Sequence, residues 1–320
     1  MSDGLPLLEV DSLVKDFPLK GGRGVLHAVN SVSFVQRRGE TLGIVGESGC
    51  GKSTLGRTIV QLLPPTSGSV RLLGKELTIL PSEALRRMRR HMQMIFQDPY
   101  ASLDPRMTVA SLIAEPMVIH DIGTAAERAS EVARLLDTVG LPPEAARRYP
   151  HEFSGGQRQR ICIARALALH PEFIVADEPV SALDVSIQSQ ILNLLNALKR
   201  DRGLTYLFIS HNLAVVKYIA DTVAVMYLGR IVEMGAAEDL YADPKHPYTR
   251  SLIAAIPRME PGSAADAPLP GGDLPNPESP PSGCAFHPRC AHATEICRTT
   301  APAMTEHGPR KHVVFCHLHR

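Results

Sequence analysis

The stretch Gly46-Glu47-Ser48-Gly49-Cys50-Gly51-Lys52-Ser53 decides how this chain of 320 residues folds. It follows a short apolar segment at 41–45 that predicts a β-strand. It precedes residues 54–63, whose pattern predicts a helix that stops at Pro64-Pro65. A glycine-rich turn between a strand and a helix presents backbone N–H groups at the positive helix end, where phosphate groups bind. The sequence therefore predicts a phosphate-binding loop.

A loop of this type has a defined chemistry for a nucleoside triphosphate and Mg²⁺. We expect Lys52 to reach the β- and γ-phosphates of ATP and the Ser53 hydroxyl to hold Mg²⁺. The predicted nucleotide contacts are Gly46, Glu47, Ser48, Gly49, Cys50, Gly51, Lys52, Ser53 and Thr54.

Composition and charge exclude several other classes of protein. The formal net charge of +1 gives no general electrostatic basis for nucleic acid, so no nucleic-acid partner is expected. No apolar run approaches the roughly 18 residues of a membrane span, and we expect any membrane role to come through partners. The N-terminus does not match a secretory signal, which predicts a reducing cytosol where the six cysteines are thiols or metal ligands.

The chain is predicted to divide into five segments. They are a nucleotide-binding core in two parts (1–97 and 161–256), a helical subdomain between them (98–160), a proline- and glycine-rich linker (257–283) and a cysteine-rich tail (284–320). The core is expected to hold antiparallel strands within 10–34, around a turn at Lys20-Gly21-Gly22, and later strands at 173–176, 205–209 and 223–227.

Two further motifs point to hydrolysis of a bound nucleotide. Asp177 and Glu178 end an apolar strand, so Asp177 is expected to anchor Mg²⁺ and Glu178 to polarise the attacking water, a role worth roughly 10²–10⁴-fold in rate. Ser154-Gly155-Gly156-Gln157 opens a helix, with Ser154 suited to the N-cap and two glycines that leave backbone amides open to an anion.

The order of these motifs, over about residues 8–256, resembles the ATP-binding subunit of an ABC transporter. The resemblance implies an α/β ABC-type P-loop ATPase with a RecA-like core, an antiparallel β portion and a helical subdomain. It implies that residues 154–157 contact the γ-phosphate of ATP on a second subunit. It also implies a Mg²⁺ and partner-sensing role for Gln97, a switch role for His211, communication across the dimer through Ser181 to Asp184, and adenine stacking for Phe17.

Longer strings are similar to the F-type ATPases of dipeptide and oligopeptide importers. They are residues 56–59, 96–106 and 245–249. This similarity implies a paralogous second ATPase, two membrane permeases, an external peptide-binding protein and a place on the cytoplasmic face of the membrane. Importers of nickel and other small solutes share these strings, and a soluble ABC ATPase without permeases is the alternative from another class.

Four cysteines in the tail, Cys284, Cys290, Cys297 and Cys316, are spaced C-x5-C-x6-C-x18-C. A tail this small can hardly build a core of its own, so a metal is expected to hold it. Zinc, an iron–sulfur cluster and uncoordinated thiols all remain open on spacing alone. The resemblance to dipeptide importers implies a [4Fe-4S] cluster. The tail histidines are expected to be solvated or outside the ligand set, with His317, next to Cys316, the least ordinary of them.

The other two cysteines lie outside the tail. Cys162 is expected to be a small buried residue. Cys50 lies near Lys52 and a helix N-terminus, surroundings that lower a thiol pKa. A need for a small side chain at this position is the favoured explanation of Cys50, ahead of a redox role. Alkylation of Cys50 is still expected to block ATP binding, and bound ATP is expected to shield the thiol.

Overall fold

The computed structural model describes residues 6–19, 24–256, 275–276 and 278–319, which fall into two compact units. The first unit comprises the chain up to Gln36, residues 40–78 and everything from Ile209 onward; the second comprises residues 37–39 and 79–208. The predicted turn at 20–22 and most of the predicted linker at 257–283 lie outside the described residues. The five predicted segment boundaries stay predictions.

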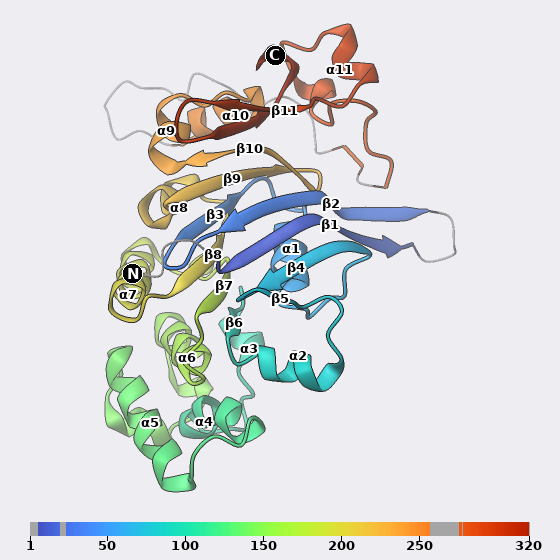
Figure 1. Cartoon of the computed structure of the whole chain (residues 1–320). Coiled ribbons are helices and arrows are strands. Elements are labelled where there is room, and N and C mark those ends of the chain that lie inside the picture. The colour runs from blue at the N-terminus through green and yellow to red at the C-terminus, as the bar shows by residue number, and fades with distance from the viewer. Residues whose placement is uncertain (1–5, 20–23, 257–274, 277, 320) are drawn as a thin grey trace. The chain divides into compact units, whose positions relative to one another are not determined.

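Two sheets build the first unit (Figure 1). An antiparallel sheet has the order β2-β1-β4-β5 and consists of β1 (Leu8–Pro18), β2 (Val25–Gln36), β4 (Ser67–Leu72) and β5 (Lys75–Glu76). The other has the order β11-β12-β10-β9-β3, from β3 (Thr41–Val45), β9 (Thr222–Tyr227), β10 (Arg230–Ala236), β11 (Met304–His307) and β12 (His312–Phe315). The parallel pair β3 and β9 is buried along nearly its whole length, as its continuous apolar runs require.

The helices of the first unit are α1 (Lys52–Ile59), α8 (Leu213–Ile219), α9 (Ala237–Ala242), α10 (Pro247–Ala254) and α11 (Glu295–Thr299), with short 3-10 turns at His287–Arg289 and His317–His319. Helix α1 begins two residues before the prediction and ends at Ile59 rather than at residue 63. Gln61 adopts a left-handed backbone with φ of 56°, which the right-handed helix cannot include.

The second unit holds three strands that are neighbours in the order β8 (Thr205–Ile209), β7 (Phe173–Asp177) and β6 (Met92–Ile95). Ile209, the last residue of β8, is assigned to the first unit. Its helices are α2 (Ser82–Met88), α3 (Pro99–Ser102), α4 (Val109–Ile119), α5 (Ala125–Thr138), α6 (Gly155–Leu167) and α7 (Val185–Arg202), with 3-10 turns at Pro143–Arg147 and Pro150–Glu152. The predicted helical character of residues 98–160 is therefore observed. No helix in the described part of the chain is long and apolar enough to cross a membrane.

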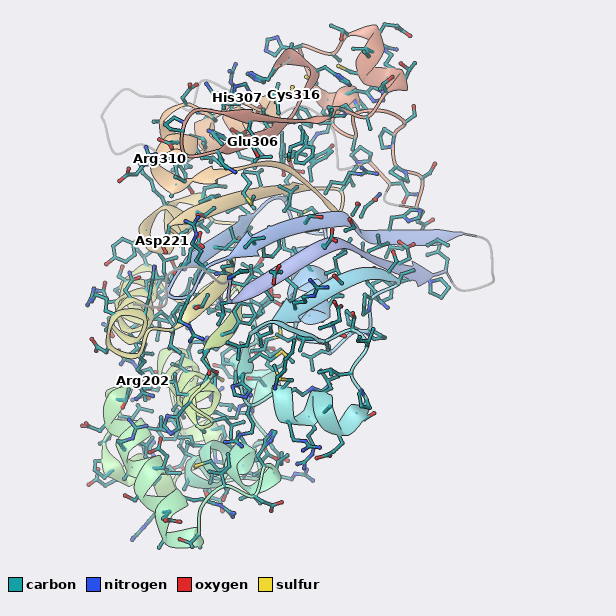
Figure 2. All side chains as sticks on the ribbon, in the orientation of Figure 1. Arg202, Asp221, Glu306, His307, Arg310 and Cys316 are labelled. Atoms are coloured by element: carbon teal, nitrogen blue, oxygen red, sulfur yellow. The ribbon has the colours of Figure 1, made fainter. Side chains whose placement is uncertain are left out.

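The C-terminal segment belongs to the first unit and packs there through contacts that the sequence did not indicate. Strand β12 pairs antiparallel with β10 through Val313 and Val314, the latter fully buried. Phe286 is 2% exposed. Figure 2 shows Glu306, His307, Arg310 and Cys316 within this segment. The segment needs no core of its own because it completes the core of the sheet beside it.

Glu233 on β10 is fully buried and links β10 to the C-terminal segment. Its carboxylate accepts hydrogen bonds from His312 Nε2 at 2.7 Å and from the backbone N–H groups of Lys245 and His246 at 2.7 and 2.8 Å. Burial opposes the charge, but the bonds from His312, Thr249 and the two backbone groups outweigh it and lower the pKa of Glu233. His312 is 6% exposed, so this tail histidine is not solvated and instead belongs to the hydrogen-bond network of Glu233.

Replacing Glu233 by alanine should destabilise the protein by about 3–5 kcal/mol, because His312 and two backbone N–H groups lose their acceptor in a buried place. The folded-state pKa of Glu233 lies below its ordinary value of 4.5. The contribution of Glu233 to the free energy of unfolding is therefore complete above pH 4.5 and is lost as the pH falls through the lowered pKa. Urea unfolding at several pH values measures both effects. Glu238→Ala is the control, since exposed Glu238 also pairs with the C-terminal segment, through Arg310. Equal, small losses in the free energy of unfolding of the two variants would contradict the role of Glu233.

Candidate nucleotide-binding site

The loop between β3 and α1 has the form that a phosphate-binding loop requires. Lys52, which is 4% exposed, begins α1 and turns back under the loop, where its Nζ donates to the carbonyls of Gly46 and Glu47 at 2.8 and 2.9 Å. Two carbonyls of the loop therefore face the ammonium group. The positive charge of Lys52 and the N-terminal end of α1 lie together, which favours a bound anion.

Glycine is required at two loop positions for steric as well as conformational reasons. A Cβ on Gly46 would lie 2.2 Å from the carbonyl oxygen of Met226 on β9, and one on Gly51 would lie 2.0 Å from that of Ala28 on β2. Both glycines also have positive φ, 154° and 104°. The neighbouring strands β9 and β2 therefore leave no space for a side chain at either loop position.

Cys50 is buried within this loop, and the expectation of a lowered thiol pKa is wrong. Its side chain is 1% exposed, and burial raises the pKa of the thiol although the nearby Lys52 acts in the opposite direction. The thiol therefore fills space, as the favoured interpretation predicted, and its burial leaves it poorly placed to react. Cys162 is 2% exposed, which confirms the expectation for that residue.

Glu47 makes two contacts that the sequence did not indicate. Its carboxylate forms a two-point ion pair with Arg289, at 3.0 and 3.1 Å, and its backbone N–H donates to the Tyr248 hydroxyl at 3.0 Å. Tyr248 lies within residues 245–249, a string similar to one in peptide-importer ATPases, but nothing in the local sequence indicated that Tyr248 contacts the loop. The separation of 242 residues between Glu47 and Arg289 explains why spacing gave no signal.

In the second unit, the carboxyl ends of two parallel strands bring Gln97 and Glu178 together. Ile95 on β6 pairs with Ala176 on β7, so Gln97 and Glu178 each lie two residues beyond this paired position. Gln97 Nε2 donates to Glu178 Oε2 at 3.1 Å, and Asp177, at the end of β7, is fully buried. Glu178 has a φ of 46°, a strained conformation for a residue other than glycine, and such strain is typical of functional sites.

The Ser154 segment forms the predicted helix start. Ser154 is the N-cap of α6, with its Oγ accepting from Gln157 N–H at 3.4 Å and its own N–H donating to Gln157 Oε1 at 3.0 Å. Gly156 also has a packing role, because a Cβ there would lie 2.5 Å from Cγ2 of Ile187 on α7. The predicted N-cap is confirmed, and the contact with α7 is an addition from the structure.

The remaining predicted nucleotide-site residues lie at element ends or a strand edge. Asp184 is the exposed N-cap residue of α7, and exposed His211 lies in the turn before α8. Phe17 on β1 is half-buried, with Lys15 Nζ 5.0 Å from its ring centroid. Their roles toward a nucleotide stay predictions.

A metal-binding tail is not shown by the four tail cysteines. No group of three or more His, Cys, Asp or Glu side chains in the described ranges is arranged to hold a metal ion. Burial, and then the three other tail cysteines, raise the pKa of Cys284 to about 11. Cys284 N–H also donates to the carbonyl of Cys297 at 2.8 Å.

Comparison with solved structures shows the same fold in ABC ATPases. The dimeric post-hydrolysis structure of the ATP-binding cassette MJ0796, bound to ADP and Pi, has a TM-score of 0.66 and 29% identity and covers 72% of this chain and 98% of its own. The cbiO1 protein of Clostridium perfringens, part of the ABC transporter complex cbiONQ, has a TM-score of 0.65 and 26% identity, with coverage of 74% and 91%.

Sequence comparison extends this likeness to nearly the whole chain. Residues 29–181 match the ABC transporter family, and residues 232–297 match the C-terminal region of oligopeptide/dipeptide transporters. The oligopeptide transport ATP-binding protein AppF of Bacillus subtilis is 50% identical over 98% of this chain and 97% of its own. A Brucella ovis protein named for peptide import and ATP binding is 53% identical over 95% of each chain. This chain therefore belongs to the ABC transporter family, as the ATP-hydrolysing subunit of an oligopeptide/dipeptide transporter.

Proposed function

We propose that this subunit drives the import of dipeptides and oligopeptides through two membrane permeases, from the cytoplasmic face of the membrane. The matching C-terminal region and the names of relatives that are half identical over almost their full lengths support this substrate class. An external binding protein would deliver the peptide. A second ATPase subunit, a paralogue by the F-type resemblance, would complete the motor.

The observation that carries the catalytic assignment is the hydrogen bond between Gln97 and Glu178 at the ends of β6 and β7. Glu178 is the proposed base that polarises the attacking water, and Gln97 holds its carboxylate in a defined orientation. His211, by its place in the motif order, is proposed to hold the γ-phosphate and the water. Phosphoryl transfer depends mainly on such positioning and on neutralisation of charge.

The proposed ATP and Mg²⁺ ligands have the right donor chemistry. Mg²⁺ prefers hard oxygen ligands, and the hydroxyl of Ser53, the carboxylate of Asp177 and the amide oxygen of Gln97 are of that kind. When bound, Mg²⁺ would neutralise phosphate charge. Lys52 supplies a further positive charge from the loop, and its burial within the loop supports that role.

Two subunits are proposed to enclose two ATP molecules, with the helix start at Ser154 of each facing the γ-phosphate bound by the other. The capped N-terminus of α6 supports anion binding, since its first backbone N–H groups have no partner inside the helix. Asp184, exposed before α7, is proposed to communicate across this dimer. Closure with ATP and opening after hydrolysis would then drive the permeases.

The proposed permease contact is the surface that follows Gln97. Tyr100 on α3 is 62% exposed, and the guanidinium of Arg158 lies over its ring at 3.8 Å. Asp104 accepts from Arg106, and these hydrogen bonds lower the pKa of Asp104 to about 2, so both groups are charged at neutral pH. An exposed aromatic ring beside fixed charges suits a docked helix from another protein.

We expect Glu178→Gln to retain MgATP binding and to lose most ATP turnover, on the order of 10²–10⁴-fold. The amide keeps the shape and the hydrogen-bonding position but cannot accept a proton from water. Nucleotide binding and phosphate release should be measured together on the purified complex with its partner subunit. Wild-type turnover in the variant would contradict the role of Glu178. Glu172→Gln is the control, because Glu172 lies just before β7 and outside the proposed site.

We also propose that Cys284, Cys290, Cys297 and Cys316 hold a [4Fe-4S] cluster, with zinc as the alternative. The support for this proposal is the resemblance of the tail to that of dipeptide importers and the match of residues 232–297 to their C-terminal region. Cys297 and Cys316 are each 8% exposed, so such a group would be largely enclosed. Since the sheet and Phe286 already hold the segment, the cluster would supply local rigidity around 284–297 rather than the whole attachment.

Anaerobic purification followed by iron, sulfide and zinc analysis tests the tail directly. The expected result is a brown protein with iron and sulfide in equal amounts, near four of each per chain. A colourless protein with about one zinc per chain would replace the cluster with a structural zinc. A Cys297→Ser variant should lose the bound metal in either case, and a Cys162→Ser variant should keep it.

A further inference from the structure

The turn formed by residues 284–290 contacts the phosphate loop within the first unit. The guanidinium of Arg289 donates from Nη1 and Nη2 to the two carboxylate oxygens of Glu47, at 3.0 and 3.1 Å. The side chains of Arg289 and Glu47 are only 6% and 23% exposed. A two-point pair with this burial is far less screened by solvent than a surface salt bridge, and its geometry is fixed.

The same turn also supports the second contact on Glu47. Phe286 packs its ring against Tyr248 and Tyr227, at centroid distances of 5.4 and 5.3 Å, and these two tyrosines lie 4.8 Å apart. The Tyr248 hydroxyl accepts from the backbone N–H of Glu47. The side chain and the backbone of Glu47 are therefore both held by groups that pack on one short C-terminal turn.

Fixing Glu47 has a direct consequence for Lys52. The Glu47 carbonyl is one of the two carbonyl acceptors of Lys52 Nζ, so the orientation of this peptide group helps to place the ammonium group. Glu47 also brings a negative charge into a loop that binds a polyanion. Arg289 neutralises that charge, which would otherwise oppose the triphosphate.

We propose that Arg289 is a positioning residue for ATP binding, acting through Glu47 from the C-terminal region. The proposal rests on the assignment of residues 46–54 as the ATP phosphate site. It gives this C-terminal region a role in the affinity of the subunit for nucleotide, besides any role in holding a metal. Because affinities couple reciprocally, bound ATP should in turn stabilise the turn at 284–290.

The test is MgATP affinity of the full chain, measured by calorimetric titration. Arg289→Ala should raise Kd about tenfold, a loss of about 1.4 kcal/mol, with an unchanged circular dichroism spectrum. Arg310→Ala is the matched control, because Arg310 is also a C-terminal arginine, pairs with Glu238 and Asp239 and lies outside the loop contacts. Its Kd should equal that of the wild type. Equal Kd values for the two variants would overturn the proposal.

Two further variants separate positioning from simple loss of structure. Glu47→Gln in the Arg289→Ala background removes the unpaired charge and should bind MgATP at least threefold more tightly than Arg289→Ala alone. No rescue would overturn the proposal. Arg289→Lys keeps the charge but loses the planar fork, so it should give an intermediate Kd and serves if the alanine variant does not fold.

Lys52→Ala reports on the phosphate site itself. It should lose MgATP binding whatever the role of Arg289. If Lys52→Ala still binds MgATP, the assignment of residues 46–54 as the phosphate site is refuted. If Lys52→Ala loses binding while Arg289→Ala has the wild-type Kd, only the positioning role of Arg289 is refuted.

Discussion

The close contact between the phosphate loop and its neighbouring strands is the constraint on which the rest of the site depends. Carbonyl oxygens of Met226 and Ala28 occupy the space that a side chain at 46 or 51 would need. With both glycines in place, the loop curves around Lys52, and Cys50 fills the interior beneath it. The carboxylate of Glu47 pairs with Arg289 of the C-terminal segment. Nucleotide chemistry and the C-terminal attachment thus share one loop.

The C-terminal region is part of the ATPase unit rather than an appendage. Strand β12 extends the sheet beyond β10, Glu233 joins β10 to β12 and α10, and Phe286 closes an aromatic cluster with Tyr227 and Tyr248. These contacts bury apolar surface that the segment could not bury alone. Arg289, which contacts the loop, directly precedes Cys290 in this region.

The sequence predicted those parts of the site that depend on local chain geometry. The strand and helix around residues 46–53, the acidic pair at the end of β7 and the N-cap at Ser154 all follow from short-range spacing and are observed. Contacts between distant residues could not be predicted. Arg289 meets Glu47 across 242 residues, Ile187 explains Gly156, and burial reverses the expected pKa shift of Cys50. Each of these three features depends on residues that are distant in the sequence and adjacent only in the folded chain, so a single sequence does not indicate them.

The most direct test of this account compares MgATP binding by Gly51→Ala and Gly49→Ala. Both glycines have positive φ, 104° and 82°, so both substitutions strain the backbone, but only a Cβ at 51 meets a neighbouring carbonyl, whereas position 49 is open. Calorimetric titration should show a loss of affinity of about 100-fold or more for Gly51→Ala and a much smaller loss for Gly49→Ala. Equal affinities in the two variants would show that the close contact with β2 does not shape the nucleotide site.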